Sequence, residues 1–178
     1  MSLQALDVPV QWHAPPEAAA SLIAAARRAI GVFAADPAQR RIGALVHSHF
    51  ELAWHALQYL VDWRLAPGRR FCEWGSGFGV VTCLAAKLGF DARGIEIEGR
   101  LVAAAQLLAE EAALPVRFEC ADYWMPDYVP PAADVVYAYP WPAEERHVFA
   151  LFERCAPAGA LLLSYHGGKQ LRLHRQGG

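Results

Sequence analysis

The pattern of hydrophobic and polar positions changes near residue 69. Before it, apolar residues recur every three or four positions over two long stretches, which predicts helices. The first is expected to begin after Pro15-Pro16 and to end at Asp36-Pro37, and the second to run from Arg41 to about Arg64. Residues 1–15 show no such period, and we expect them to be irregular.

From Arg69 onward, short apolar runs alternate with longer helical stretches, which is typical of repeated βαβ units and a parallel sheet. The chain after residue 168 is either a short sixth strand or a frayed tail. The pattern predicts a single α/β domain: a Rossmann-like, open, mostly parallel sheet of five to seven strands with helices on both faces. Residues 1–67 would form a helical N-terminal cap and residues 68–178 the core. The expected strands are 69–74, 92–97, 116–121, 134–139 and 160–166.

Composition narrows the function classes. Hydrophobic residues make up 55% and charged residues 19% of the 178 positions, so the chain is globular and not disordered. The net charge of −2 and the lack of any Lys/Arg run make nucleic acid an unexpected partner. We expect no membrane-spanning helix and no secretory signal. The four cysteines are widely spaced, which favours buried thiols in a reducing cytoplasm and gives no metal site.

Residues 71–80, FCEWGSGFGV, are a glycine loop between the first strand and the next helix. Gly75, Gly77 and Gly79 allow tight turns and close approach of a ligand, and the helix N-terminus favours anionic groups. Dinucleotide enzymes use G-x-G-x-x-G, but here position 80 is Val80. Glu73 at the mouth would repel a pyrophosphate and would favour a ligand with an ammonium and a sulfonium group.

Two further strand ends carry acids. Glu96 ends the second strand, where a carboxylate can accept hydrogen bonds from both hydroxyls of a ribose. Asp122 follows the third strand, where it can accept from an exocyclic amine such as that of adenine, and Tyr123 would border the ring. Because the carboxyl ends of parallel strands share one edge, these positions describe an amino acid, a ribose and a base bound side by side.

The motifs EWGSGFG, GIE and CAD resemble those of class I S-adenosylmethionine (SAM)-dependent methyltransferases over residues 69–166. The resemblance implies SAM as cofactor and S-adenosylhomocysteine (SAH) as product. It implies that Glu73 and the loop Gly75, Ser76, Gly77 and Gly79 hold the methionine part, Glu96 the ribose, and Asp122 with Tyr123 the adenine. A looser resemblance is to short lysine-directed protein methyltransferases.

The fourth strand end reads Ala138-Tyr139-Pro140-Trp141. Related amino-methyltransferases often carry Asn or Asp where Ala138 stands, so the resemblance does not support a nucleic-acid base or glutamine as acceptor. Tyr139 and Trp141 could stabilise a sulfonium or a substrate ammonium by cation–π contact, or they could simply pack the sheet edge.

Three residues are our catalytic candidates: Tyr139, His55 and His166. His47, Glu51 and His55 recur every four residues, so on the expected helix they would share one face, aimed either at the cofactor or at solvent. His166 ends the fifth strand, within expected reach of a substrate. We expect no metal site from the histidines, because His49 would lie on another side of the helix.

The leading hypothesis is a SAM-dependent methyltransferase whose acceptor is an unidentified small molecule or protein side chain. The alternative is a SAM-binding sensor or partner subunit without catalysis, and a nicotinamide-dependent oxidoreductase is a third possibility. Few residues follow the fifth strand, so we expect its edge to be open to a second copy of the chain, as in a homodimer.

Overall fold

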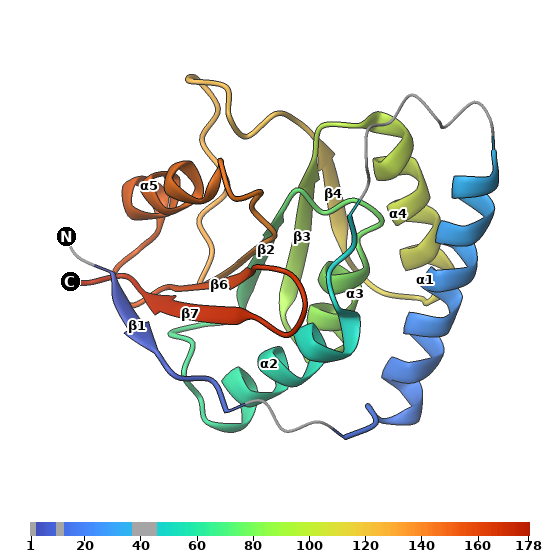
Figure 1. The fold of residues 1–178 in the computed structure, drawn as a ribbon, viewed down its shortest axis with the longest axis horizontal. Helices are drawn as coiled ribbons and strands as arrows, with labels where there is room; N and C mark the ends of the chain where they lie inside the picture. Colours follow the sequence, from blue (N-terminus) through green and yellow to red (C-terminus); the bar gives the residue numbers. More distant parts are fainter. Residues whose placement is uncertain (1–2, 10–12, 37–45) are drawn as a thin grey trace.

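The computed structural model describes residues 3–9, 13–36 and 46–178 of the chain. Within these residues a seven-stranded sheet runs in the order β1-β7-β6-β5-β2-β3-β4 (Figure 1). The strands are β1 (Gln4–Leu6), β2 (Arg70–Trp74), β3 (Asp91–Glu96), β4 (Arg117–Cys120), β5 (Val135–Ala138), β6 (Leu161–Tyr165) and β7 (Leu171–Arg175). The strands β2 to β6 run parallel to one another, and β7 runs antiparallel to both β6 and β1.

The five parallel strands confirm the five strands that the sequence predicts, each within one or two residues of its expected bounds. Strand β2 lies between β3 and β5. From β2 the chain first adds β3 and β4 on one side and then returns to add β5 and β6 on the other. This point is the topological switch of an open α/β sheet, beside which a ligand is expected to bind.

Helices cover both faces of the sheet, as predicted. Four lie on one side, α1 (Glu17–Ala35), α2 (Phe50–Asp62), α3 (Val80–Lys87) and α4 (Gly99–Glu111), and α5 (Glu145–Cys155) lies on the other (Figure 1). The alternation of side chains along the strands explains the division. Phe71 of β2 faces the first group of helices, while the next residue, Cys72, joins the separate core beneath α5.

The expected N-terminal cap is a part of this helical layer. Helix α1 is long and apolar enough in composition to cross a membrane. In this structure, however, its Leu22, Ile23 and Ala26 are buried in the core, and it packs against α3 and α4. Helix α2 also packs on α3.

Two expectations for the first half of the chain are wrong. Residues 4–6, expected to be irregular, form β1, and residues 46–49, expected to be helical, precede α2. The first turn of α2 is capped by His49, whose Nδ1 accepts a hydrogen bond from the Leu52 N–H at 3.4 Å. This cap fixes the helix start, because it satisfies a backbone donor that has no partner inside the helix. The rest of the expected helix start, residues 41–45, lies outside the described residues.

The predicted open edge beyond the fifth strand is also wrong. Strand β7 pairs along β6, and β1 then pairs along β7 with Gln4 opposite Arg175. Both ends of the chain therefore meet at this edge (Figure 1). The expected dimerisation through an exposed fifth strand loses its structural basis.

Candidate functional site

A cavity of about 840 Å³ lies at the carboxyl ends of the parallel strands. Its walls come from the loop after β2, the β3–α4 turn, the loop after β4, the β5–α5 connection, the end of β6 and the segment that leads into α2. Most of the predicted site residues meet here, whereas Gly79 and His55 do not line it. The predicted residues that line the cavity are Glu73, Gly75, Ser76, Gly77, Glu96, Asp122, Tyr123, Tyr139 and His166.

The glycine loop adopts a backbone that only glycine takes without strain. Gly75, Gly77 and Gly79 have φ values of 74°, 52° and 66°, all in the left-handed region. Gly79 is the N-cap of α3, and a Cβ at this position would collide with the ring of Phe118. The sequence interpretation placed Gly79 against the ligand, but its role in the structure is close packing of α3 against β4.

Glu73 points from β2 to the start of α3. Its Oε2 accepts hydrogen bonds from the Thr82 N–H at 2.8 Å and from the Thr82 hydroxyl at 2.6 Å. Burial raises the pKa of Glu73 to about 8, and the Thr82 hydrogen bonds oppose that shift. In the ligand-free protein this carboxyl therefore holds its proton at neutral pH, and a cation placed beside it would favour the ionised form.

Glu96 joins the glycine loop to the next turn. Its Oε2 accepts from the Gly77 N–H at 2.8 Å, and its Oε1 accepts from the Glu98 N–H at 3.0 Å. Two backbone donors thus fix the carboxylate at the cavity wall, directly beyond β3. The geometry agrees with the predicted place of Glu96, at the centre of the row of strand ends.

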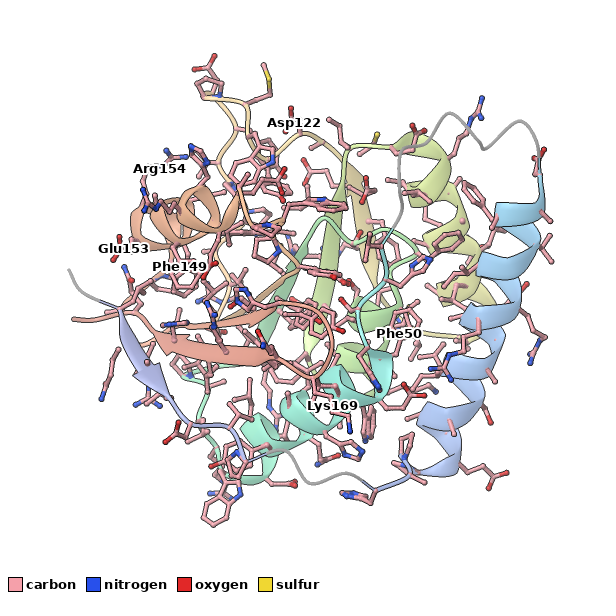
Figure 2. The ribbon with its side chains drawn as sticks, viewed as in Figure 1. Phe50, Asp122, Phe149, Glu153, Arg154 and Lys169 are labelled. Atoms are coloured by element: carbon pink, nitrogen blue, oxygen red, sulfur yellow. The ribbon has the colours of Figure 1, made fainter. Side chains whose placement is uncertain are left out.

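Asp122 and Tyr123 form the wall beyond β4. The Asp122 Oδ1 accepts from the Trp124 N–H at 2.9 Å, which holds the start of the loop in a turn. The ring of Tyr123 stacks on that of Trp74, with centroids 5.9 Å apart and planes 28° from parallel. Figure 2 shows Asp122 at the top of the view, at the end of β4. A flat ligand group at this wall would meet an aromatic surface beside a carboxylate.

Ser76 supplies a polar group without a protein partner. The residue is 6% exposed, it lines the cavity, and its Oγ has no hydrogen-bond partner among the described residues. A buried hydroxyl without a partner is costly in a folded protein. The Oγ atom itself is covered and lies 2.7 Å from where a Cβ at Gly94 would be, so the side chain packs against β3.

The β5–α5 connection forms the other side of the cavity. Ala138 is 1% exposed and packs in the core under α5, so it does not face the cavity. The first side chain from this strand to line it is Tyr139, whose ring meets that of Tyr165 edge to face at 4.6 Å. Trp141 is half exposed, and its backbone N–H donates to the Glu144 Oε2 at 3.3 Å.

His166 sits in a polar cluster at the end of β6. Its Nε2 is 2.9 Å from the Ser164 hydroxyl, and its Nδ1 is 3.9 Å from Glu145, which also pairs with Arg172 at 2.6 Å. Burial lowers the pKa of His166, and Arg172 lowers it further, while Glu145 opposes them. The imidazole is therefore neutral near pH 7 and keeps a nitrogen lone pair.

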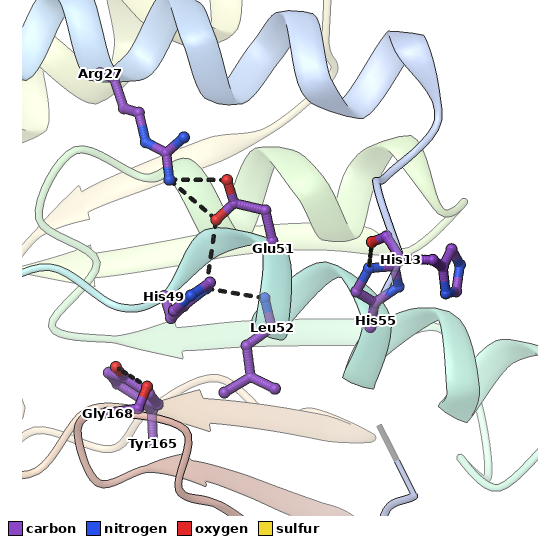
Figure 3. A network of polar contacts seen from close by, with 8 residues as sticks. All are labelled: His13, Arg27, His49, Glu51, Leu52, His55, Tyr165 and Gly168. Atoms are coloured by element: carbon purple, nitrogen blue, oxygen red, sulfur yellow. Dashed lines mark hydrogen bonds and ion pairs between the residues drawn. The ribbon is translucent and has the colours of Figure 1, made fainter. Parts of the chain in front are cut away.

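His55 is not part of the cavity. It is buried in α2, where its Nε2 lies 2.7 Å from the His13 carbonyl oxygen and its ring lies 4.2 Å from the His13 ring (Figure 3). Its role is to tie the segment before α1 to α2. The catalytic prediction for His55 is not supported by this position.

The predicted shared face of His47, Glu51 and His55 does not form. His47 precedes α2, and Glu51 instead binds Arg27 at 2.8 Å (Figure 3). His47 lines the cavity with its ring 5.9 Å from Phe78, and burial lowers its pKa. Of the two histidines on the predicted face, His47 lines the cavity and His55 does not.

Metal ligands are not grouped in the part of the chain that the structure describes: no three residues among His, Cys, Asp and Glu could hold an ion there. The cysteine side chains of Cys72 and Cys83 are buried, as expected, but Cys120 is exposed. The exposure follows from the position of Cys120 at the end of the edge strand β4.

Several cavity residues were not predicted as site residues. Trp124 and Glu144 come a few residues after the ends of β4 and β5 in the sequence. This sequence position is the one signal that could have predicted them as cavity residues. Phe78 stands inside the glycine motif itself. No sequence motif marks Glu145 or Arg172. They line the cavity because α5 and β7 come together in the fold, where Arg172 donates a hydrogen bond to Glu145.

Comparisons with known proteins add to this geometry. No protein-family model matches the chain, and neither does any curated protein at a significant level. Solved structures do match. An RNA methyltransferase from Salinibacter ruber, crystallised with SAH, superimposes with a TM-score of 0.58 at 21% identity, over 74% of this chain and 92% of that one.

Two further structures agree. An O-methyltransferase from Bacillus cereus with SAH gives a TM-score of 0.57 at 18% identity, over 79% of this chain and 65% of that one, which is less than two thirds of its length. A cofactor-bound protein from MTB gives a TM-score of 0.62 at 18% identity, over 86% and 73% of the two chains. At such identities a structural match establishes the fold and leaves substrates open. The chain has the fold of the class I SAM-dependent methyltransferases.

Proposed function

We propose that this protein is a methyltransferase that binds SAM in the cavity and transfers its methyl group to an acceptor. The observation that carries the proposal is the meeting of Glu96, Asp122 and the left-handed glycine loop in one cavity at the switch point of the sheet. SAH in the similar structures agrees with this choice of cofactor.

The residues present fit the parts of SAM. The glycine loop with Ser76 and Glu73 would hold the amino-acid end, where the carboxyl of Glu73 would ionise beside an ammonium group. Glu96 would accept from the ribose hydroxyls. Asp122 would accept from the adenine amine, and Tyr123 would border the ring. Gly79 supports the loop from behind through its contact with Phe118.

When bound, SAM supplies a methyl group already activated on a sulfonium. Held by the glycine loop, Glu96 and Asp122, SAM would supply this methyl group to the acceptor's lone pair, and the electron pair of the carbon–sulfur bond would stay on sulfur. The chain's own task is to align the acceptor and to exclude water. Tyr139 and the neutral His166 line the cavity and are our candidates for orienting the acceptor or accepting its proton.

We infer that the acceptor is a small molecule or a protein side chain. The fold match to an RNA methyltransferase does not extend to its substrate. A phosphate backbone would meet repulsion at the acidic cavity, and the chain has no basic run to compensate. A cytoplasmic location remains an expectation from the composition.

A SAM-binding protein without catalysis is the second candidate. The observation that favours it is the β5 end, where buried Ala138 leaves no Asn or Asp facing the cavity. Production of SAH in the presence of an acceptor panel would distinguish an enzyme from a sensor.

Calorimetry with SAM and SAH tests the proposal. We expect binding to the wild-type protein, and about tenfold weaker binding to Asp122→Asn, since one hydrogen bond to a charged group is lost. Asp127→Asn is the matched control, because Asp127 is exposed on the same loop and does not line the cavity. Absence of SAM and SAH binding at millimolar concentration, or a thermal shift with NAD in place of SAM, would refute it.

A further inference from the structure

The cavity is lined by far more acidic than basic side chains. Among the described residues that line it, the one arginine is Arg172, and the other basic side chains are His47 and His166. No lysine is among these lining residues. The acidic residues that line the cavity are Glu73, Glu96, Glu98, Asp122, Glu144 and Glu145.

The basic groups add little positive charge to the cavity. Arg172 is bound to Glu145 at 2.6 Å, so each cancels the other. Burial lowers the pKa of both His47 and His166, which leaves them neutral near pH 7. An anionic acceptor would find no uncommitted cation among the described lining residues.

Two of the six acids do not count as free negative charges, because the raised pKa of Glu73 keeps it protonated and Glu145 is paired with Arg172. The remaining four carboxylates are Glu96, Glu98, Asp122 and Glu144. None of them forms an ion pair within the described part of the chain. A cleft lined by one sign of charge concentrates its field and attracts ligands of the opposite sign. The cavity is therefore built for a positively charged ligand.

Three of these carboxylates belong to the SAM side. Glu96 and Asp122 would bind the ribose and the adenine, and Glu98 caps α4 by accepting from the Arg100 N–H at 3.2 Å. Glu144 is different because it comes from the opposite wall, at the start of α5. Its Oε2 accepts from the Trp141 N–H at 3.3 Å.

Glu144 also lines the cavity and acts electrostatically on Tyr123. Burial raises the pKa of the Tyr123 hydroxyl, and the charge of Glu144 is the next largest cause. The Tyr123 hydroxyl in turn lies 3.8 Å from where a Cβ at Gly75 would be. Glu144, Tyr123 and Gly75 thus line the same cavity, with Glu144 contributed by the start of α5.

The walls beside Glu144 are aromatic. Tyr139, Trp141 and Trp124 line the cavity together with Glu144. Ring faces attract ammonium groups, so carboxylate and rings favour the same kind of ligand. The size and place of the cavity are independent of its charge: about 840 Å³ at the topological switch point of the sheet is the space that a small-molecule ligand occupies.

We infer that the methyl acceptor carries an ammonium group, and that Glu144 binds this group beside the rings of Tyr139 and Trp141. The inference rests on the proposed function and specifies its acceptor. Glu144 supplies from the start of α5 the anchoring side chain that the end of β5 lacks. The ammonium could belong to a small molecule or to a lysine side chain, which present the same chemistry.

Matched probes test the inference on the SAH-saturated protein. Phenethylamine and 3-phenylpropionate share a ring and a two-carbon linker and differ in the sign of their charge. Calorimetry should show phenethylamine binding about tenfold tighter than 3-phenylpropionate, as expected for one charged contact in a partly buried site. Nα-acetyl-lysine amide and phenethylamine then distinguish a lysine side chain from an aromatic amine as the preferred source.

Two variants locate the contact. Glu144→Gln should weaken phenethylamine binding about tenfold and leave SAH affinity within about twofold. Glu153→Gln is the matched control: it removes one charge from the same helix, and Glu153 lies on α5 outside the cavity (Figure 2). It should change neither affinity.

Every outcome of these titrations either supports or refutes the inference. The inference is wrong if 3-phenylpropionate binds as tightly as phenethylamine, if neither amine probe binds, or if Glu144→Gln behaves like Glu153→Gln. Failure of the proposed function has a separate signature, because it would appear as absent SAH binding in the first titration. In that case the same probes, titrated into the protein without SAH, still decide whether Glu144 binds ammonium groups.

Discussion

Gly79→Ala should destabilise the protein strongly, although the change adds a single methyl group. Gly79 is the N-cap of α3 with φ at 66°, a conformation that costs an L-residue about 1–2 kcal/mol. The new Cβ would collide with the Phe118 ring and lie 2.9 Å from the Cβ of Ala105. Overpacking of this kind costs about 1–3 kcal/mol.

The net effect follows from these terms. Replacing glycine restricts the unfolded chain and returns about 0.4–1 kcal/mol, so we expect a loss of about 1–4.6 kcal/mol in the free energy of unfolding. For a domain of this size the melting temperature should fall by about 2–18 °C. Urea unfolding and thermal melting followed by circular dichroism would measure both quantities.

Two variants show whether the stated cause is right. Gly31→Ala lies in α1, has no atom within 4 Å of its new Cβ, and should be neutral or stabilising by up to about 1 kcal/mol. Phe118→Leu removes the ring that Gly79→Ala would meet, so the double variant should recover part of the loss. A melting temperature for Gly79→Ala equal to that of the wild type would refute the argument.

Three further predictions concern stability. Glu73 binds its proton more tightly in the folded protein, because its pKa rises on folding. The melting temperature of the wild type should therefore fall as the pH rises from about 4.5 to 8, and Glu73→Gln should flatten this fall. Equal pH profiles for the two proteins would contradict the raised pKa. Asp134 has a lowered pKa because of its hydrogen bonds with Arg70. In urea unfolding, Asp134→Asn should be less stable than the wild type at pH 7, and the difference in free energy of unfolding should shrink as the pH falls below about 4. A difference that stays constant with pH would count against the Arg70–Asp134 pair. Leu6→Ala should cost about 1 kcal/mol in the same assay, since Leu6 packs against the core from β1, and no change would mean that β1 does not secure the sheet.

The sequence predicted the central sheet because its signals are local. Each parallel strand is a short apolar run followed by a helix-length stretch, and this pattern needs no knowledge of distant residues. The carboxyl ends of parallel strands share one edge, so the order of strands and helices along the chain is enough to place Glu73, Glu96 and Asp122 together. The spacing of the glycines indicated the cofactor class for the same reason.

Other features depended on contacts between distant parts of the chain. Strand β1 has three residues, too few for an alternating pattern, and it forms because β7 at the far end of the chain offers it an edge. The expected common face of His47 and His55 failed because helical spacing applies only after the helix has begun, and the His49 cap sets the start of α2 at Phe50.

The acceptor side was the least predictable part for a related physical reason. The sequence by itself determined the fold class and the row of acids and glycines at the strand ends, since these follow from strand ends and a glycine loop with fixed local geometry. Only the tertiary structure showed that Ala138 is buried, that Arg172 is neutralised by Glu145, and that Glu144 lines the cavity from α5. The charge of a cavity depends on which side chains are paired, and pairing is decided by packing between elements far apart in the chain.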